Sequence, residues 1–292
     1  MPIKDILLVL DSHPVPTPVS TIEKAVDLSH WLDARVTALT FALKIESPVG
    51  FYWDPLHVGG AFAEETRKSA SAAGELVAAF ESLASRRNVA RAHVVVKDCP
   101  PLEAGARLAD QARLHDLMIL PHYERSQVKS EDRVFDIGLQ TKNAEAAIFD
   151  SGHPVLLLPE QPKRPLSSAP DRIALAWDHS GRAARAVGDA LPFLRRAKHV
   201  EVVTIMGEKP LRIRSGAQLI EHLARHGIDA VFQEYPSHGK PIGEALEAYA
   251  AEREIDLLVM GAYGHSRMRE FVLGGATRRM PQRPPVWTLL SH

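Results

Sequence analysis

The glycines of residues 260–277 are spaced in a way that suits the binding of phosphate. They stand at positions 261, 264, 274 and 275, directly after an apolar run that predicts a buried strand. Glycine lets a backbone turn sharply and bring its N–H groups close to an anion, and the N-terminus of a following helix adds unpaired donors. Thr277 adds a hydroxyl donor nearby. The stretch predicts a phosphate site; the alternative is that the glycines only shape a loop and separate two helices.

A carboxylate is expected close to this loop. Asp178 ends the apolar run 172–178, which predicts the first strand of the second half of the chain. In open α/β sheets, ligands bind in the crevice outside the carboxyl ends of the strands. A carboxylate there can accept hydrogen bonds from ribose hydroxyls or from an adenine amine. Asp178 and the glycines together therefore predict a nucleotide site.

These residues resemble the universal stress protein family. Its nucleotide-binding members end their fourth strand with G-x2-G-x9-G-S/T, and Gly261, Gly264 and Gly274 fit that spacing. The resemblance includes Asp178 and the closing strand 286–290, and it extends over both halves of the chain. It implies a tandem, two-domain universal stress protein whose domains are Rossmann-like and similar to the adenine nucleotide α-hydrolases.

The resemblance also implies which residues contact the ligand. Ile205 and Met260 would flank the adenine, and Asp178 would meet the base or the ribose. The loop residues would hold the ribose and the phosphates, namely Gly261, Gly264, Gly274, Gly275, Ala276 and Thr277. The implied ligand is ATP or another adenine nucleotide, such as ADP or AMP, with Mg²⁺ as a companion ion.

The loop departs from the family pattern in two places. Gly275 stands where the motif has Ser or Thr, so one side-chain donor is lost while a backbone N–H remains. We expect weaker binding of a triphosphate, with Thr277 as a partial substitute. Pro281 falls in the expected final helix, which should be short because proline removes a backbone donor and clashes with the preceding turn.

The first half of the chain lacks the glycine motif. Pro121 stands at the position that matches Gly261, and proline has no N–H to offer a phosphate. Gly138 further along has no second glycine beside it. We therefore expect the first half to be a structural or regulatory partner that does not bind nucleotide in the same way.

Short apolar strands alternate with helical patterns along both halves. Strands are expected at 4–11, 36–41, 93–97, 114–120 and 153–158, and again at 172–178, 200–205, 230–235, 254–260 and 284–290. Helices are expected at 20–32, 64–86, 102–113, 182–194, 215–226 and 242–252. Such alternation is typical of parallel sheets covered on both faces. The predicted fold is α/β, with two doubly wound parallel-sheet domains in tandem.

A proline-rich segment divides the chain near its middle. Residues 159–170 contain four prolines and no hydrophobic period, which predicts a linker between domains at 1–160 and 170–292. The first half is longer by about 27 residues, and the segment 45–61 is the expected insertion. We expect a loop folded over its own domain; the alternative is a lid built on the aromatic residues 51–53.

Composition narrows the functional classes. The chain has 292 residues, 45% apolar and 24% charged, and its 35 basic side chains balance 36 acidic ones. That balance gives no general attraction to nucleic acid or to an anionic membrane. Cys99 is the single cysteine, so it is either a buried hydrophobic residue or a redox-sensitive thiol. The first apolar run is too short for a signal sequence, and we expect a cytoplasmic protein.

Motifs for metal binding and for catalysis are missing from the sequence. The fourteen histidines form no H-E-x-x-H pattern, and neither G-x-S-x-G nor a P-loop occurs. We therefore do not expect a dedicated enzyme. The favoured function is a nucleotide-responsive signalling or protective module with a protein partner that the sequence does not identify. The alternatives are a slow ATPase or adenylyl transferase that uses Asp178 and Mg²⁺, and a nucleotide-free scaffold.

Family resemblance further implies how the halves associate. The two halves would form an intramolecular pseudo-dimer, with strands 155–158 and 286–290 at the contact. Burying two apolar edge strands against each other removes an aggregation hazard. A homodimer of the whole chain is a second arrangement that stays open.

Overall fold

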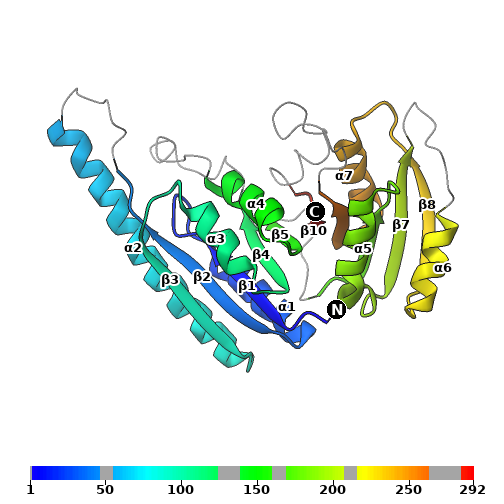
Figure 1. Cartoon of the computed structure of the whole chain (residues 1–292), viewed down its shortest axis with the longest axis horizontal. Helices are drawn as coiled ribbons and strands as arrows, with labels where there is room; N and C mark the ends of the chain where they lie inside the picture. The colour runs from blue at the N-terminus through cyan, green and yellow to red at the C-terminus, as the bar shows by residue number, and fades with distance from the viewer. Residues whose placement is uncertain (1, 47–54, 124–138, 160–168, 207–215, 263–283) are drawn as a thin grey trace. The chain divides into compact units, whose positions relative to one another are not determined.

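The computed structural model describes residues 2–46, 55–123, 139–159, 169–206, 216–262 and 284–292 (Figure 1). The chain divides into an N-terminal unit, Lys4–Ser151, and a C-terminal unit, Gly152–His292 with Met1–Ile3. Most of the expected linker lies outside the described residues. The domain limits 1–160 and 170–292 therefore stay a prediction.

The N-terminal unit is a parallel sheet with helices on both faces. Its strands are β1 (Asp5–Leu10), β2 (Arg35–Leu43), β3 (Arg91–Cys99) and β4 (Leu117–His122), in the order β3-β2-β1-β4. Its helices are α1 (Val19–Leu32), α2 (Pro55–Arg86), α3 (Ala104–Ala112) and α4 (Leu139–Asp150). Helices α3 and α4 lie in front of the sheet and α2 lies behind it (Figure 1).

The C-terminal unit has the strand order β5-β10-β9-β6-β7-β8. The strands are β5 (Val155–Pro159), β6 (Arg172–Ala176), β7 (His199–Met206), β8 (Ala230–Pro236), β9 (Leu257–Gly261) and β10 (Trp287–Ser291), and the helices are α5 (Gly181–Leu194), α6 (Ala217–Arg225) and α7 (Ile242–Glu252). On β8, Phe232 packs against Gly216 beside α6 and Tyr235 against Tyr249 of α7. Because successive strand residues point to opposite faces, α6 and α7 cover opposite faces. The predicted doubly wound α/β fold is confirmed.

One strand runs against the predicted parallel pattern. β5 pairs antiparallel with β10, Leu156 opposite Leu289, whereas β10 pairs parallel with β9. This pairing is the strand contact that the sequence analysis predicts for 155–158 and 286–290. It covers the apolar edge of β10, which explains why β10 is buried along its whole length.

The two units repeat the same stabilising contacts atom for atom. In the N-terminal unit, Asp116 Oδ2 accepts hydrogen bonds from the backbone N–H groups of Lys4 and Asp5, at 2.8 and 3.0 Å. In the C-terminal unit, Asp256 Oδ2 accepts from the two N–H groups at the start of β6, at 3.0 and 2.9 Å. Asp116 therefore ties the start of β4 to the start of β1, and Asp256 ties the start of β9 to the start of β6 in the same way.

A second repeated contact lies at the other end of β1 and β6. Thr40 Oγ1 donates to the Leu10 carbonyl at 2.9 Å, and Thr204 Oγ1 donates to the Trp177 carbonyl at 2.8 Å. Both threonines are buried, so each hydroxyl satisfies a carbonyl that water does not reach. The equivalence of these contacts supports the internal repeat and aligns Asp11 with Asp178.

Two helices differ from the predicted pattern. α2 begins at Pro55, nine residues before the predicted start at Glu64, because proline is well suited to the first helical position. The aromatic residues 51–53 lie outside the described residues. α4 was not predicted, since its twelve residues include few large apolar side chains and give a weak helical period.

Burial settles the environment of the single cysteine. Cys99 is fully buried, and burial raises the pKa of its thiol, which keeps it protonated and unreactive. The interpretation of Cys99 as a small hydrophobic residue is therefore favoured.

None of the described helices combines the length and the apolar character that crossing a membrane requires.

Candidate functional site

The candidate nucleotide site lies where the strand order of the C-terminal unit reverses. From β6 the chain continues to β7 and β8 on one side, then returns through α7 to β9 on the other side. Both β7 and β9 are parallel neighbours of β6. The carboxyl ends of β6 and β9 therefore form a topological switch point, which is where sheets of this kind bind ligands.

The strand register brings the predicted residues of β6 and β7 to the same edge of the sheet. Ala176 pairs with Val203, so Asp178 and Ile205 each follow by two positions. Asp178 is exposed, whereas Ile205 is 9% exposed. A carboxylate open to solvent thus lies beside an apolar side chain that has only a small surface left to contact a ligand.

Asp178 is held at the start of helix α5. One carboxylate oxygen, Oδ1, accepts a hydrogen bond from the backbone N–H of Ser180 at 2.9 Å. Ser180 is the N-cap of α5, and its hydroxyl accepts from the N–H of Ala183 at 3.0 Å. The positive end of the helix dipole therefore lies next to Asp178, which favours negative charge at this point.

The end of β9 packs tightly against the same helix start. Met260 is 6% exposed and pairs with β10, and Gly261 follows it at the end of the strand. A Cβ atom on Gly261 would lie 2.7 Å from the backbone N of Ala183 and 2.7 Å from the carbonyl carbon of Arg182. Glycine is therefore required here for helix–strand packing, whether or not a phosphate binds.

The other predicted loop residues lie outside the described residues. They are Gly264, Gly274, Gly275, Ala276 and Thr277, and Pro281 lies in the same stretch. The structure thus brings together Asp178, Ile205, Met260 and Gly261, and the phosphate-binding role of the loop stays a prediction.

Trp177, which precedes Asp178, was not singled out from the sequence. Its backbone is fixed between two contacts with β7, since its N–H donates to Val203 and its carbonyl accepts from Thr204. Its indole Nε1 is buried, and the described part of the chain provides no acceptor for it. Its ring lies 5.2 Å from the ring of His179, whose φ of 60° is in the left-handed region. The sequence did offer one sign of this arrangement, namely a tryptophan near the end of the predicted strand 172–178.

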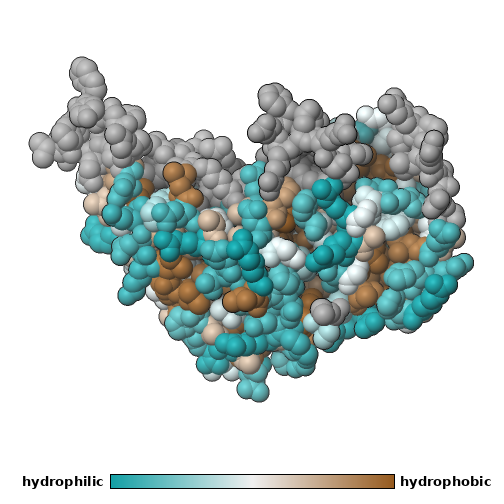
Figure 2. Space-filling view, in the orientation of Figure 1, coloured by the Kyte–Doolittle hydropathy of each residue, from teal (hydrophilic) through white to brown (hydrophobic). Residues whose placement is uncertain are grey.

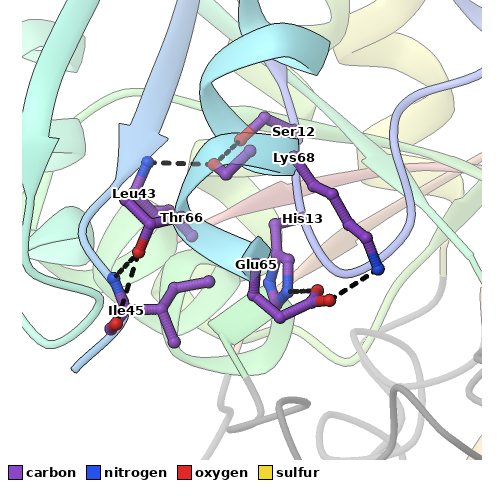
Figure 3. Close-up of polar contacts among 8 residues, drawn as sticks. Ser12, His13, Leu43, Ile45, Glu65, Thr66 and Lys68 are labelled. Carbon is purple, nitrogen blue, oxygen red and sulfur yellow. Dashed lines mark hydrogen bonds and ion pairs between the residues drawn. The ribbon is translucent and has the colours of Figure 1, made fainter. Parts of the chain in front are cut away.

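The equivalent strand end of the N-terminal unit is tied to helix α2 by hydroxyl groups (Figure 3). Ser12 Oγ donates to the Phe41 carbonyl at 2.5 Å and lies 2.8 Å from Ser69 Oγ on α2. Ser69 Oγ also accepts from the backbone N–H of Leu43 at 2.9 Å. The ends of β1 and β2 are therefore joined through one residue of α2.

A buried pair of an imidazole and a carboxylate continues this cluster (Figure 3). His13 Nε2 lies 3.1 Å from Glu65 Oε2, and both side chains are less than a tenth exposed. Lys68 Nζ donates to the other oxygen of Glu65 at 2.7 Å. Burial raises the pKa of Glu65, but the hydrogen bonds from Lys68 and His13 outweigh it, and the pKa is lowered overall. The carboxylate is thus kept ionised and joins the β1–α1 connection to α2.

The residue types of this cluster invite comparison with a catalytic triad. Ser12, His13 and Glu65 supply a hydroxyl, an imidazole and a carboxylate. The hydroxyl proton of Ser12, however, is donated to the carbonyl of Phe41 rather than to a base. An activated nucleophile needs its proton directed at the base, so the cluster is structural.

Asp11, the counterpart of Asp178, has a different environment. Burial raises the pKa of its carboxyl to about 7, so a large fraction is protonated and uncharged near neutral pH. Within β4, Pro121 is buried and offers no N–H. The two strand ends of the N-terminal unit thus differ chemically from those of the C-terminal unit.

In the described residues, no group of three or more His, Cys, Asp or Glu side chains could hold a metal ion.

Comparison with known proteins identifies relatives of this chain by sequence and by fold. The sequence is 25% identical over 173 residues to the universal stress protein Slr1230 of Synechocystis, across 52% of this chain and 56% of that relative. The chain is a relative of the universal stress proteins. No protein-family model matches the sequence.

Solved structures of universal stress proteins share the fold over nearly the full length. A universal stress protein from Archaeoglobus fulgidus aligns with 98% of this chain and 95% of its own, with a TM-score of 0.64 at 15% identity. A putative universal stress protein from Pseudomonas aeruginosa aligns with 99% of this chain and 93% of its own, with a TM-score of 0.53 at 14% identity. At these identities the likeness shows the tandem α/β fold and no more.

Proposed function

We propose that the C-terminal unit binds an adenine nucleotide at the carboxyl ends of β6, β7 and β9. The observation that carries this proposal is the exposed carboxylate of Asp178, held at the N-terminus of α5 at the switch point of the sheet. The carboxylate is suited to accept hydrogen bonds from a ribose or an adenine amine, and the helix start favours the phosphates. Gly264, Gly274, Gly275, Ala276 and Thr277 complete the proposed site.

The nucleotide acts as a signal in this proposal. A ligand shifts a protein between two states only by its differential affinity for them, so binding would bias the surface offered to a protein partner. The chain would then work as a cytoplasmic stress-response module that reports the level of ATP, ADP or AMP. The N-terminal unit would be its structural or regulatory partner in an intramolecular pseudo-dimer, because its strand ends carry Asp11, whose pKa is raised to about 7, and Pro121 in place of the site residues.

An enzymatic alternative rests on the same carboxylate. An exposed aspartate beside a triphosphate could hold Mg²⁺ and support slow ATP hydrolysis or adenylyl transfer. Prolonged incubation of the full chain with labelled ATP and Mg²⁺ distinguishes the signalling module from the enzyme. Recovery of intact nucleotide supports the signalling module, whereas turnover that is lost in Asp178→Ala supports the enzyme.

Thermal unfolding of the full chain tests the site itself. A ligand at 100 times its dissociation constant stabilises the native state by about 2.7 kcal/mol, which is a visible rise in melting temperature. We expect ATP to raise the melting temperature of the wild type and of Asp11→Asn, but not that of Asp178→Ala. If ATP raises the melting temperature of Asp178→Ala as much as that of the wild type, Asp178 does not contact the nucleotide.

A further inference from the structure

Helix α6 carries two histidines one turn apart at its C-terminal end (Figure 1). His222 and His226 are four positions apart, and no other pair among the fourteen histidines of the sequence has a spacing of three or four. Residues four apart on a helix are neighbours on one face, with Cβ atoms about 5–6 Å apart. The two rings are accordingly in contact, with their centroids 4.8 Å apart and their planes at 69°. The helix therefore holds two imidazoles side by side.

Both imidazoles can be reached from solvent. Leu219 and Leu223 are buried and form the inner face of α6, whereas His222 is exposed and His226 is partly exposed. The outer surface of α6 is mostly hydrophilic (Figure 2). Imidazole rings at a surface turn about χ2 at little cost, because this torsion has a broad energy profile. A ligand in solution can therefore contact a nitrogen of each ring at the same time.

A pair of neighbouring imidazoles is a donor set that suits a divalent transition-metal ion. Imidazole is the commonest metal ligand in proteins and binds Zn²⁺, Cu²⁺ and Ni²⁺. Two nitrogens that bind one ion at about 2.0–2.1 Å, at a right angle, lie about 3 Å apart. Rings with centroids 4.8 Å apart can bring their nitrogens to that separation. The same spacing of two histidines on one helix face binds zinc in the H-E-x-x-H motif.

We propose that His222 and His226 together bind one divalent transition-metal ion, with water in its remaining coordination positions. Two protein ligands are fewer than the three or four of catalytic and structural zinc sites, so binding should be weaker than in those sites. Affinity should be highest for Cu²⁺, which a given nitrogen site binds more tightly than Ni²⁺ or Zn²⁺. His222 lies in the last turn of α6 and His226 is its C-cap, where the negative end of the helix dipole favours a cation. The proposal is independent of nucleotide binding.

The guanidinium group of Arg195 competes with the metal ion for one of the two rings. Arg195 is the C-cap of α5, and its Nη2 lies 3.4 Å from Nδ1 of His226. A guanidinium has only donors, so Nδ1 must be the acceptor. Metal bound at Nδ1 needs that lone pair, and metal bound at Nε2 leaves the proton on Nδ1, so either mode breaks the contact. The hydrogen bond is long and therefore weak, and a metal ion can displace it.

Calorimetric titration of the untagged full chain with copper(II) iminodiacetate tests the site. Two adjacent imidazoles together fill the coordination positions that this chelate leaves open, whereas a lone imidazole fills them only in part. We expect one saturable equivalent per chain, and we expect His222→Ala and His226→Ala each to raise the dissociation constant at least about tenfold, since losing an outer-shell partner alone costs about 10–100-fold. The matched control is His30→Ala, an exposed histidine in the last turn of α1, which should leave the constant unchanged. No saturable binding by the wild type, or full binding by His222→Ala, would overturn the proposal.

Removing the competing guanidinium tests the geometry around the pair. Arg195→Ala should lower the dissociation constant about two- to tenfold, the ordinary worth of one hydrogen bond. Arg196→Ala removes the same charge from the neighbouring residue, whose guanidinium donates to the Pro192 carbonyl, and should change nothing. Electron paramagnetic resonance of the bound Cu²⁺ should show two imidazole nitrogens in the wild type and in Arg195→Ala, and fewer in His222→Ala. Binding that is unchanged or weaker in Arg195→Ala would refute the competition, and a wild-type spectrum with a single imidazole would refute the paired site.

Discussion

Replacing Gly261 with alanine should destabilise the C-terminal unit through a steric clash rather than through backbone strain. Gly261 is not among the residues with positive φ, so alanine can adopt its backbone conformation. The added methyl group would, however, lie 2.7 Å from two backbone atoms of the first turn of α5, at Arg182 and Ala183. Backbone atoms cannot rotate away as a side chain can, so the helix start must shift.

The size of the effect follows from two opposing contributions. Forcing an extra methyl group into a packed region costs about 1–3 kcal/mol. Replacing glycine by alanine also restricts the unfolded chain, which stabilises the protein by about 0.4–1 kcal/mol where the native conformation tolerates it. We therefore expect a net loss of about 1–2 kcal/mol in the free energy of unfolding of the C-terminal unit.

Gly188 provides a matched control in the same helix. It lies inside α5, and a Cβ atom there would have no neighbour within 4 Å. Gly188→Ala should therefore stabilise the unit by about 0.5–1 kcal/mol, the ordinary gain of alanine over glycine in a helix. Urea unfolding of the full chain, followed by circular dichroism, measures both variants. If Gly261→Ala is as stable as the wild type, the close packing of β9 on α5 is wrong.

Three further predictions concern single side chains. The pKa of Asp11 is raised to about 7 from an unfolded value near 3.8, so the folded state holds its proton longer and stability falls as pH rises from about 4 to 7. Asp11→Asn should flatten that fall, by at most about 4 kcal/mol, in unfolding curves measured from pH 4 to 8. The pKa of Glu65 is lowered, so its contribution is present above the unfolded value and is lost as pH falls through the folded value. Glu65→Gln should cost about 1–3 kcal/mol at pH 7 and little at pH 3; an equal loss at both would contradict the ionised pair with His13 and Lys68. Ser180→Ala should cost about 1 kcal/mol by removing the N-cap of α5, whereas Ser180→Asp should keep most of the stability, as urea midpoints would show.

Much of the architecture could be predicted because it depends on local patterns. Apolar strands that end in aspartate open both halves, and the structure joins each half through an equivalent aspartate, Asp116 or Asp256. Helix α4 escaped prediction because its apolar residues are small and its period is weak. The early start of α2 also escaped, since a proline permits a helix start without requiring one.

The candidate site was predictable in part. Asp178 and Gly261 were found from the strand–loop pattern, but the contact of Gly261 with the start of α5 depends on how two elements far apart in sequence approach each other. The buried pair of His13 and Glu65 joins residues 52 positions apart, and no local period signals such a contact. Trp177 was visible in the sequence, while the burial of its indole N–H was not.

Calorimetric titration of the full chain with ATP tests the central claim most directly. One nucleotide should bind per chain, in the C-terminal unit. Binding should be lost in Gly274→Val, where a side chain would fill the space for the phosphates, and should be unchanged in Pro121→Gly. Two nucleotides per chain, or one that survives Gly274→Val and Asp178→Ala together, would contradict it.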